Sequence, residues 1–174
     1  MSDNYLKSIM DARCIKLLKD FNENDLIFKS MRKTNTGSRI IDVDGNTMFQ
    51  TCWLNILYDV ENSICVNSEQ IKDILSQIDK MVIDHSSLVL GFEKPEIIKM
   101  YRSLTSDTKC YFYISILSNT VLFDRYKNFY KDKTEIKSIL KQGQYVRFIF
   151  NFKKIYFKDH EITFPLELQQ IELA

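Results

Sequence analysis

The chain has 174 residues, of which 45% are hydrophobic and 13% aromatic, with only four Gly and two Pro. This composition supplies enough apolar material for one folded core and excludes collagen-like, low-complexity and disordered chains. The formal net charge is +1, but the stretch 109–158 carries eleven Lys and Arg against three Asp and Glu, a local net charge of +8. Such an asymmetry indicates that one region binds a polyanion.

Export, membrane and metal signals are missing from the sequence. Charged residues interrupt the N-terminal segment, and no run approaches the roughly 18 apolar residues of a transmembrane helix. Neither His85 nor His160 lies near a Cys pair at zinc-finger spacing, so no metal and no cofactor are expected. The widely spaced cysteines predict buried free thiols in a reducing compartment, which favours a cytoplasmic protein without a membrane segment: Cys14, Cys52, Cys65 and Cys110.

The first half of the chain predicts a helix and then a three-stranded meander. Apolar residues spaced by three and four predict an amphipathic N-terminal helix over residues 1–22. Strands are predicted over 25–34 and 38–43 around an Asn-Thr-Gly turn at 35–37. A third strand over 47–60 follows the Asp-Gly-Asn turn at 44–46.

The central part alternates helices and strands. Ser68 is placed to cap a helix that continues through Val82, and a short strand is predicted over 87–92. A helix over 93–104 follows, with Pro95 in its first turn. Strands over 109–117 and 121–123 precede a short helix over 134–140, which Gly143 ends.

The last thirty residues give the clearest strand signal. Residues 145–153 alternate, with Val146, Phe148, Phe150 and Phe152 on one face. After a turn near 158–161, residues 162–168 alternate again, and Pro165 predicts an edge or a bulge. The expected fold is α+β and mainly β: a single domain over 1–174, whose residues 25–174 form an OB-like curled or closed antiparallel barrel with inserted helices.

The sequence favours a binding protein over an enzyme. It contains no Gly-rich phosphate loop, no nucleophile elbow and no HExxH motif. Asp42 with Asp44, and Asp59 with Glu61, stand at strand spacing, but a metal-dependent nuclease normally adds further carboxylates and a Lys. We interpret these carboxylates as solvated turn and strand-end residues, and no catalytic residue is assigned.

Aromatic and basic residues share several strand faces and one loop. Binding of single-stranded DNA requires aromatic rings on which bases stack, worth ~1–3 kcal/mol per base, and cations along the phosphates. The loop 125–133 interleaves four cations with three aromatic residues. For Trp53, the chain's single Trp, a stacking role and a core role are equally open. The candidate nucleic-acid-binding residues are Arg32, Lys33, Arg39, Phe49, Trp53, Tyr111, Tyr113, Arg125, Tyr126, Lys127, Tyr130, Lys131, Arg147, Lys154 and Tyr156.

Three stretches, 37–53, 88–96 and 143–173, follow one another in an order that resembles the single-stranded-DNA-binding proteins of large cytoplasmic DNA viruses and yeast cytoplasmic linear plasmids. Gln50, Thr51 and Trp53 match that family's third strand, where Pro is common at the position that Cys52 holds. The family's Gly-rich continuation and acidic tail are absent. The resemblance implies an OB-like fold, a role in DNA replication, and binding of single-stranded DNA with little sequence preference, with replication proteins as further partners.

The main alternative is a protein–protein interaction module, such as a viral scaffold or a transcription-complex subunit, that uses the same aromatic and basic face. Salt distinguishes the two, because binding of single strands through Z cations weakens with a log–log slope of about −0.7Z. The sequence leaves open whether RNA replaces DNA, how many copies associate, and how long the bound strand is.

Overall fold

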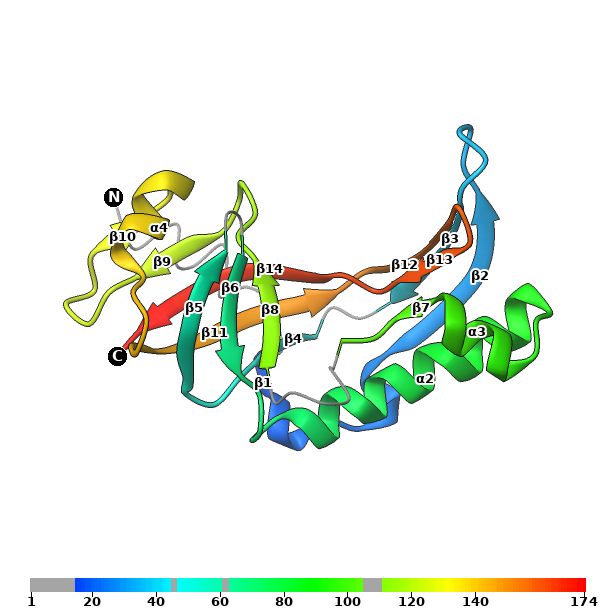
Figure 1. Ribbon diagram of the computed structural model, residues 1–174, viewed down its shortest axis with the longest axis horizontal. Helices are drawn as coiled ribbons and strands as arrows, with labels where there is room; N and C mark the ends of the chain where they lie inside the picture. Colours follow the sequence, from blue (N-terminus) through cyan, green and yellow to red (C-terminus); the bar gives the residue numbers. More distant parts are fainter. Residues whose placement is uncertain (1–14, 45–46, 61–62, 105–110) are drawn as a thin grey trace.

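A computed structural model describes residues 15–44, 47–60, 63–104 and 111–174. Its strands form two open sheets at opposite ends of the molecule (Figure 1). The order of the larger sheet is β10-β9-β14-β11-β5-β6-β8, with β4 and β1 attached through β11, and that of the smaller sheet is β2-β3-β12-β13-β7. The α+β, mainly β class is confirmed, and the sheets are curled and open instead of closed into a barrel.

The larger sheet consists of β1 (Ile15–Leu17), β4 (Met48–Gln50), β5 (Leu54–Val60), β6 (Ser63–Asn67), β8 (Tyr111–Ser115), β9 (Val121–Phe123), β10 (Phe129–Tyr130), β11 (Tyr145–Phe152) and β14 (Leu166–Leu173). The smaller sheet consists of β2 (Ile27–Lys33), β3 (Arg39–Asp44), β7 (Tyr101–Arg102), β12 (Lys154–Lys158) and β13 (Glu161–Thr163). The described helices are α2 (Lys72–Leu90), α3 (Lys94–Met100), α4 (Lys133–Ile139), and short 3-10 turns at Leu18–Asp20 and Glu23–Asp25.

One long antiparallel ribbon joins the two sheets. The chain passes from β11 directly into β12, turns, and returns through β13 and β14 (Figure 1). The predicted apolar face of β11 is buried, because Val146, Phe148, Phe150 and Phe152 are each at most 1% exposed, but Ile149 and Asn151 of the opposite face are buried as well. Burying this apolar row against the rest of the core stabilises the ribbon. The sheets are not purely antiparallel, since β1 with β4, β7 with β13, and β9 with β14 pair in parallel.

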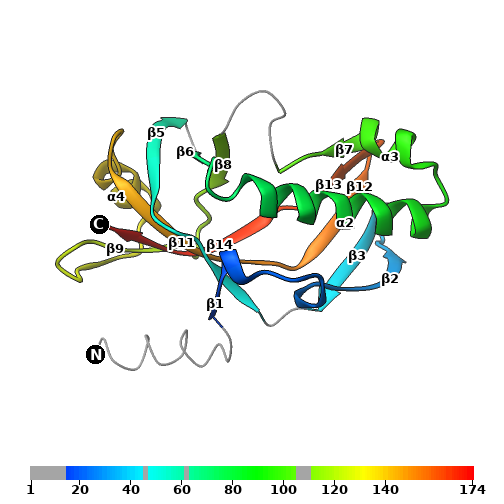
Figure 2. The same ribbon diagram turned by 90° about the horizontal axis from the view of Figure 1, so that it is seen from below.

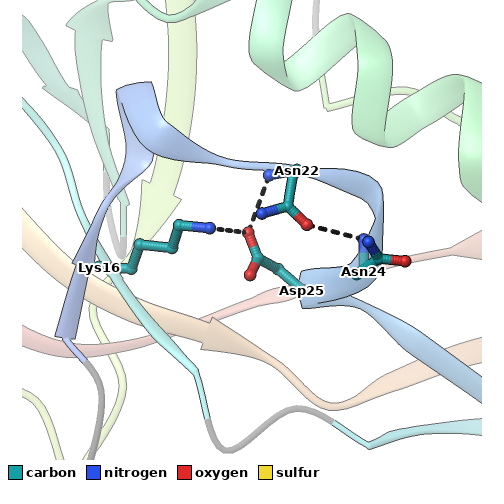
Figure 3. Close-up of polar contacts among 4 residues, drawn as sticks. All are labelled: Lys16, Asn22, Asn24 and Asp25. Carbon is teal, nitrogen blue, oxygen red and sulfur yellow. Dashed lines mark hydrogen bonds and ion pairs between the residues drawn. The ribbon is translucent and has the colours of Figure 1, made fainter.

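The start of the described chain is a strand, so the predicted N-terminal helix is wrong over residues 15–17, and its first fourteen residues lie outside the described part. Ile15–Leu17 pairs in parallel with β4 and then enters a 3-10 turn. Lys16 fixes this arrangement through a 2.7 Å ion pair with Asp25, whose carboxylate also accepts a hydrogen bond from the Asn22 N–H at 2.8 Å (Figure 3). Asn22 in turn caps the second 3-10 turn by accepting from the Asn24 N–H. Backbone pairing with β4 overrides the helical spacing of the side chains here.

Two other strand predictions are corrected. The predicted strand 87–92 is the last turn of α2, which ends at Gly91 with a left-handed φ of 72°. The predicted third strand of a meander is two strands, and β4 pairs with β1 and β11 instead of β3. The β2–β3 hairpin itself is confirmed, with Gly37 at a φ of 83° in its turn.

The structure also places one histidine and two cysteines. His85 lies on α2 and stacks on Phe28 of β2 with ring centroids 4.7 Å apart. Burial lowers the pKa of His85, so the neutral ring is favoured. Cys52 is an exposed free thiol, while Cys65 is buried as predicted.

A buried carboxylate fastens α2 to the segment that follows α3. Asp79, 6% exposed, accepts hydrogen bonds from the Tyr101 hydroxyl at 2.7 Å, from the Leu104 N–H at 3.0 Å and from the Ser103 hydroxyl. Burial, together with the neighbouring Asp79 carboxylate, raises the pKa of Tyr101, so the phenol remains a donor. This cluster holds α2 in place over the smaller sheet (Figure 2).

We expect Asp79→Ala to lower the free energy of unfolding by about 3 kcal/mol, because it leaves buried donors without an acceptor. Asp84→Ala is the matched control on the same helix. It breaks an exposed 2.7 Å ion pair with Lys94 and should cost under about 1 kcal/mol. Urea unfolding measures both, and equal losses would contradict a structural role for Asp79.

Candidate nucleic-acid interface

A bulge between β4 and β5 decides where Trp53 lies. Gln50 pairs with Ile149 and Leu54 pairs with Val146, so three residues of one strand oppose two residues of β11. Thr51 closes the bulge: its N–H donates to the Phe148 carbonyl at 3.0 Å, and its hydroxyl accepts from the Phe148 N–H at 3.0 Å. The extra residue shifts the alternation by one position.

This shift separates residues that the sequence placed on one strand face. Phe49 and Thr51 point into the core, at 0% and 2% exposed, whereas Trp53 is 40% exposed. The prediction that Phe49 contacts nucleic acid is therefore wrong, because its ring packs against Phe21 and Phe150. For Trp53 the structure favours the exposed position over the core anchor.

Arg147 of β11 lies directly over the Trp53 ring. The centre of its guanidinium is 4.9 Å from the ring centroid, within the range of a cation–π contact. Glu172 of β14 is the residue opposite Arg147 in the ladder and forms an ion pair with it. With its amide oxygen turned towards Arg147, Gln50 accepts from the guanidinium at 3.0 and 3.3 Å. The guanidinium therefore has partners from two strands as well as the indole.

Beside this pair lies a shallow depression of about 210 Å³. Trp53, Arg147 and Glu172 line it together with Phe123, Arg125 and Lys127 from the end of β9 and the turn that follows. The cross-strand register explains why residues from different strands lie side by side here. The successive partners across β11, β14, β9 and β10 are Arg147, Glu172, Phe123 and Phe129. Directly paired residues share one face of a sheet.

Asp124 holds the β9–β10 hairpin in shape. Its carboxylate accepts from the N–H groups of Tyr126 and Asn128 at 2.8 and 2.9 Å, from the Asn128 amide at 2.8 Å and from the Tyr130 hydroxyl at 3.2 Å. Burial alone would raise the pKa of Asp124, but the hydrogen bonds from Asn128 and Tyr126 outweigh it and lower the pKa. The fixed turn places Lys127 at a φ of 66°.

The hairpin presents cations and aromatic rings together. Arg125 lies 4.7 Å from the Tyr126 ring centroid, and Lys131 lies 5.0 Å from that of Phe129. Tyr126 is 70% exposed and Phe129 is 39% exposed. Within the described part of the chain, neither Arg125 nor Lys127 forms an ion pair. Both can therefore meet the phosphates of a ligand without first breaking an ion pair within this part of the protein.

The same face of the larger sheet continues across β5, β6 and β8. Tyr145 pairs with Asn55, and Tyr58 and Tyr113 flank Cys65 on neighbouring strands. The two tyrosine hydroxyls are 2.6 Å apart, and this hydrogen bond raises the pKa of Tyr58. Tyr145 and Tyr113 are 54% and 52% exposed. The opposite face is core: Leu54, Ile56, Val66, Phe112 and Ile114 are buried.

The structure thus brings seven of the fifteen predicted site residues together on one surface of the larger sheet: Trp53, Tyr113, Arg125, Tyr126, Lys127, Lys131 and Arg147. Tyr130 is half-buried there, with its hydroxyl bonded to Asp124, and the side chain of Tyr111 lies outside the described part. The members of this surface, which we call the aromatic face, are Trp53, Tyr58, Tyr113, Phe123, Arg125, Tyr126, Lys127, Phe129, Lys131, Tyr145 and Arg147.

Five predicted residues lie instead on the smaller sheet, at the other end of the molecule (Figure 1): Arg32, Lys33, Arg39, Lys154 and Tyr156. Acidic partners balance several cations of this sheet. Arg32 forms an ion pair with Asp42 at 2.7 Å, and Lys29 pairs with Asp44 at 3.1 Å. The Arg32 hydrogen bond lowers the pKa of Asp42, which keeps the pair charged.

The sequence analysis did not assign Tyr58, Phe123, Phe129 and Tyr145 to the site. Tyr58 stands at even spacing from the buried Leu54 and Ile56, but a second irregularity in the pairing, between Ile56 and Tyr58, turns its side chain outward. Tyr145 and Phe129 stand next to assigned residues, so the aromatic and basic pattern could have included them.

The described residues were also compared with the requirements of a metal site and of a membrane-spanning helix. They contain no group of three or more His, Cys, Asp or Glu side chains placed to hold a metal ion.

No described helix is both long enough and apolar enough to span a membrane.

No protein-family model and no curated protein matches the sequence. Three solved structures of the single-stranded-DNA-binding protein from bacteriophage Enc34 are similar to this chain. The structure with bound single-stranded DNA has a TM-score of 0.46 and 10% identity, covering 86% of this chain and 94% of that one. A second structure of that protein has a TM-score of 0.45 and 10% identity, covering 85% of this chain and 88% of that one. A C-terminal truncation has a TM-score of 0.44 and 9% identity, covering 83% of this chain and 93% of that one.

Proposed function

We propose that this protein binds single-stranded DNA across the aromatic face of its larger sheet. The observation that carries the proposal is the Trp53 platform, an exposed indole backed by Arg147 beside a depression that also holds Arg125 and Lys127. An unpaired base stacks on the aromatic ring while the hairpin cations meet the adjacent phosphates. Because every base has a π-face, such binding has little sequence preference.

Exposure supports this function over simple core packing. Tyr145, Tyr113 and Tyr126 are each more than half exposed on successive parts of one sheet face. Large apolar side chains that gather on one exposed face mark a binding surface. Their association with Arg125 and Lys127, which form no ion pair within the described residues, favours a polyanionic ligand with exposed bases.

We extend the proposal to the protection or organisation of single-stranded DNA during DNA replication, in the cytoplasm and without an enzymatic activity. The sequence resemblance to viral and plasmid proteins supports the replication role. RNA is an alternative ligand, and the binding assays below can compare it with DNA. A protein partner is the other alternative, and the salt dependence of binding distinguishes it from a nucleic acid.

Trp53→Ala should weaken binding to oligo-dT by ~1–3 kcal/mol, since it removes the central stacking platform. The unfolding free energy should change by less than about 1 kcal/mol, because the side chain is far from fully buried. Fluorescence anisotropy of a labelled oligonucleotide measures the affinity, and quenching of the single Trp in the wild-type protein reports stacking directly.

Tyr156→Ala on the smaller sheet is the control and should leave the affinity unchanged. A Trp53→Ala protein with a lowered melting temperature and unaltered affinity would place Trp53 in the core and contradict the proposal.

Replacing Arg125, Lys127 and Lys131 together by Ala should flatten the log–log salt dependence of binding by about 2 units, given about 0.7 for each phosphate contact. The matched control removes the same charge from the smaller sheet through Lys29, Arg32 and Lys154, and should keep the wild-type slope. Equal flattening in both proteins would mean that net charge, and not the hairpin, drives binding. A salt-independent affinity in the wild type would favour the protein-interaction alternative.

A further inference from the structure

Glu172 is a largely enclosed charged group beside the Trp53 platform, with its side chain 17% exposed. One carboxylate oxygen accepts from Arg147, and the other accepts from the Gln170 amide at 3.0 Å. Both oxygens are therefore occupied by the protein itself. A negative charge next to a DNA-binding depression is unfavourable for phosphate binding, so its position calls for another role.

We propose that Glu172 is a positioning residue that holds the Arg147 guanidinium against one face of the Trp53 indole, so that this face is filled in advance and the other is offered to a base. The inference rests on the proposed function and deepens it. The geometry supplies each step: Glu172 faces Arg147 across the β11–β14 ladder, and Arg147 lies 4.9 Å from the ring centroid. Gln50 contacts the same guanidinium from β4.

Preorganisation explains why the acidic group is useful there. Ordering a long side chain during binding costs affinity, and a guanidinium already fixed by a neighbour avoids that cost. The pair is also neutral as a whole, so the platform contributes stacking, while Arg125 and Lys127 of the hairpin contribute phosphate attraction. Glu172 thus acts on the ligand through Arg147 and Trp53 and makes no contact with DNA.

Glu172→Gln separates this role from simple electrostatics, because the two predict opposite changes in the affinity for DNA. Removing a negative charge makes the site more positive, which would tighten binding to DNA and steepen its salt dependence. Positioning predicts the reverse: affinity for oligo-dT about three- to tenfold weaker, the range expected when one more side chain is ordered on binding. In the free protein, the anisotropy of Trp53 fluorescence should fall, because the indole loses its fixed neighbour.

Glu167→Gln is the matched control on the same strand. Glu167 pairs with Lys153 at 2.5 Å, away from Trp53, so its loss should change neither affinity nor indole anisotropy. Arg147→Lys provides a second variant if Glu172→Gln fails to fold. It retains the charge and the pairing with Glu172 but loses the planar guanidinium, and should weaken binding similarly with an unchanged salt slope.

The outcomes separate this inference from the proposed function. If Glu172→Gln binds as tightly as the wild type or more tightly, while Trp53→Ala binds weakly, the positioning role is overturned and the binding site stands. If Trp53→Ala binds like the wild type, the proposed function itself fails, whatever Glu172→Gln does.

Discussion

The double hydrogen bond between Thr51 and Phe148 is the constraint on which the binding surface depends. It closes a bulge in which three residues of the β4–β5 segment oppose two of β11, and so reverses the alternation of buried and exposed positions. Upstream of the bulge, Phe49 fills the core; downstream, Leu54 and Ile56 do so, and Trp53 is turned outward. A bulge that re-aims one side chain is a common device beside functional sites. Here it brings the chain's single Trp over Arg147.

Around that point, the sheet contributes several aromatic rings, and the β9–β10 hairpin adds both rings and cations. The sheet carries the rings of Trp53, Tyr145, Tyr58 and Tyr113, and the β9–β10 hairpin carries the cations, shaped by the hydrogen bonds of Asp124. The smaller sheet has cations too, and pairs such as Arg32 with Asp42 balance some of them locally. A count of charges along the sequence therefore overstates the positive charge that the smaller sheet offers to a polyanion.

The sequence predicted the elements that depend on local pattern. The apolar face of β11, the β2–β3 turn at Gly37 and the faces of β8 follow from periodicity and turn chemistry, and all are confirmed. Features that depend on partners distant in the chain could not be predicted from the sequence. Lys16 and its neighbours have helical spacing, yet Ile15–Leu17 pairs with β4. The bulge at Thr51 arises from the register with β11, so no local pattern could separate Phe49 from Trp53 or turn Tyr58 outward.

The central claim is that exposed rings on one sheet face bind unstacked bases. Its most direct test is a competition titration, at one fixed salt concentration, between an oligonucleotide and the same sequence as a duplex. We predict that the single strand binds more tightly by more than about tenfold, because a stacked base contributes ~1–3 kcal/mol that a paired base cannot supply. Equal affinity for the single strand and the duplex would contradict the account, since phosphate attraction alone would then explain the binding.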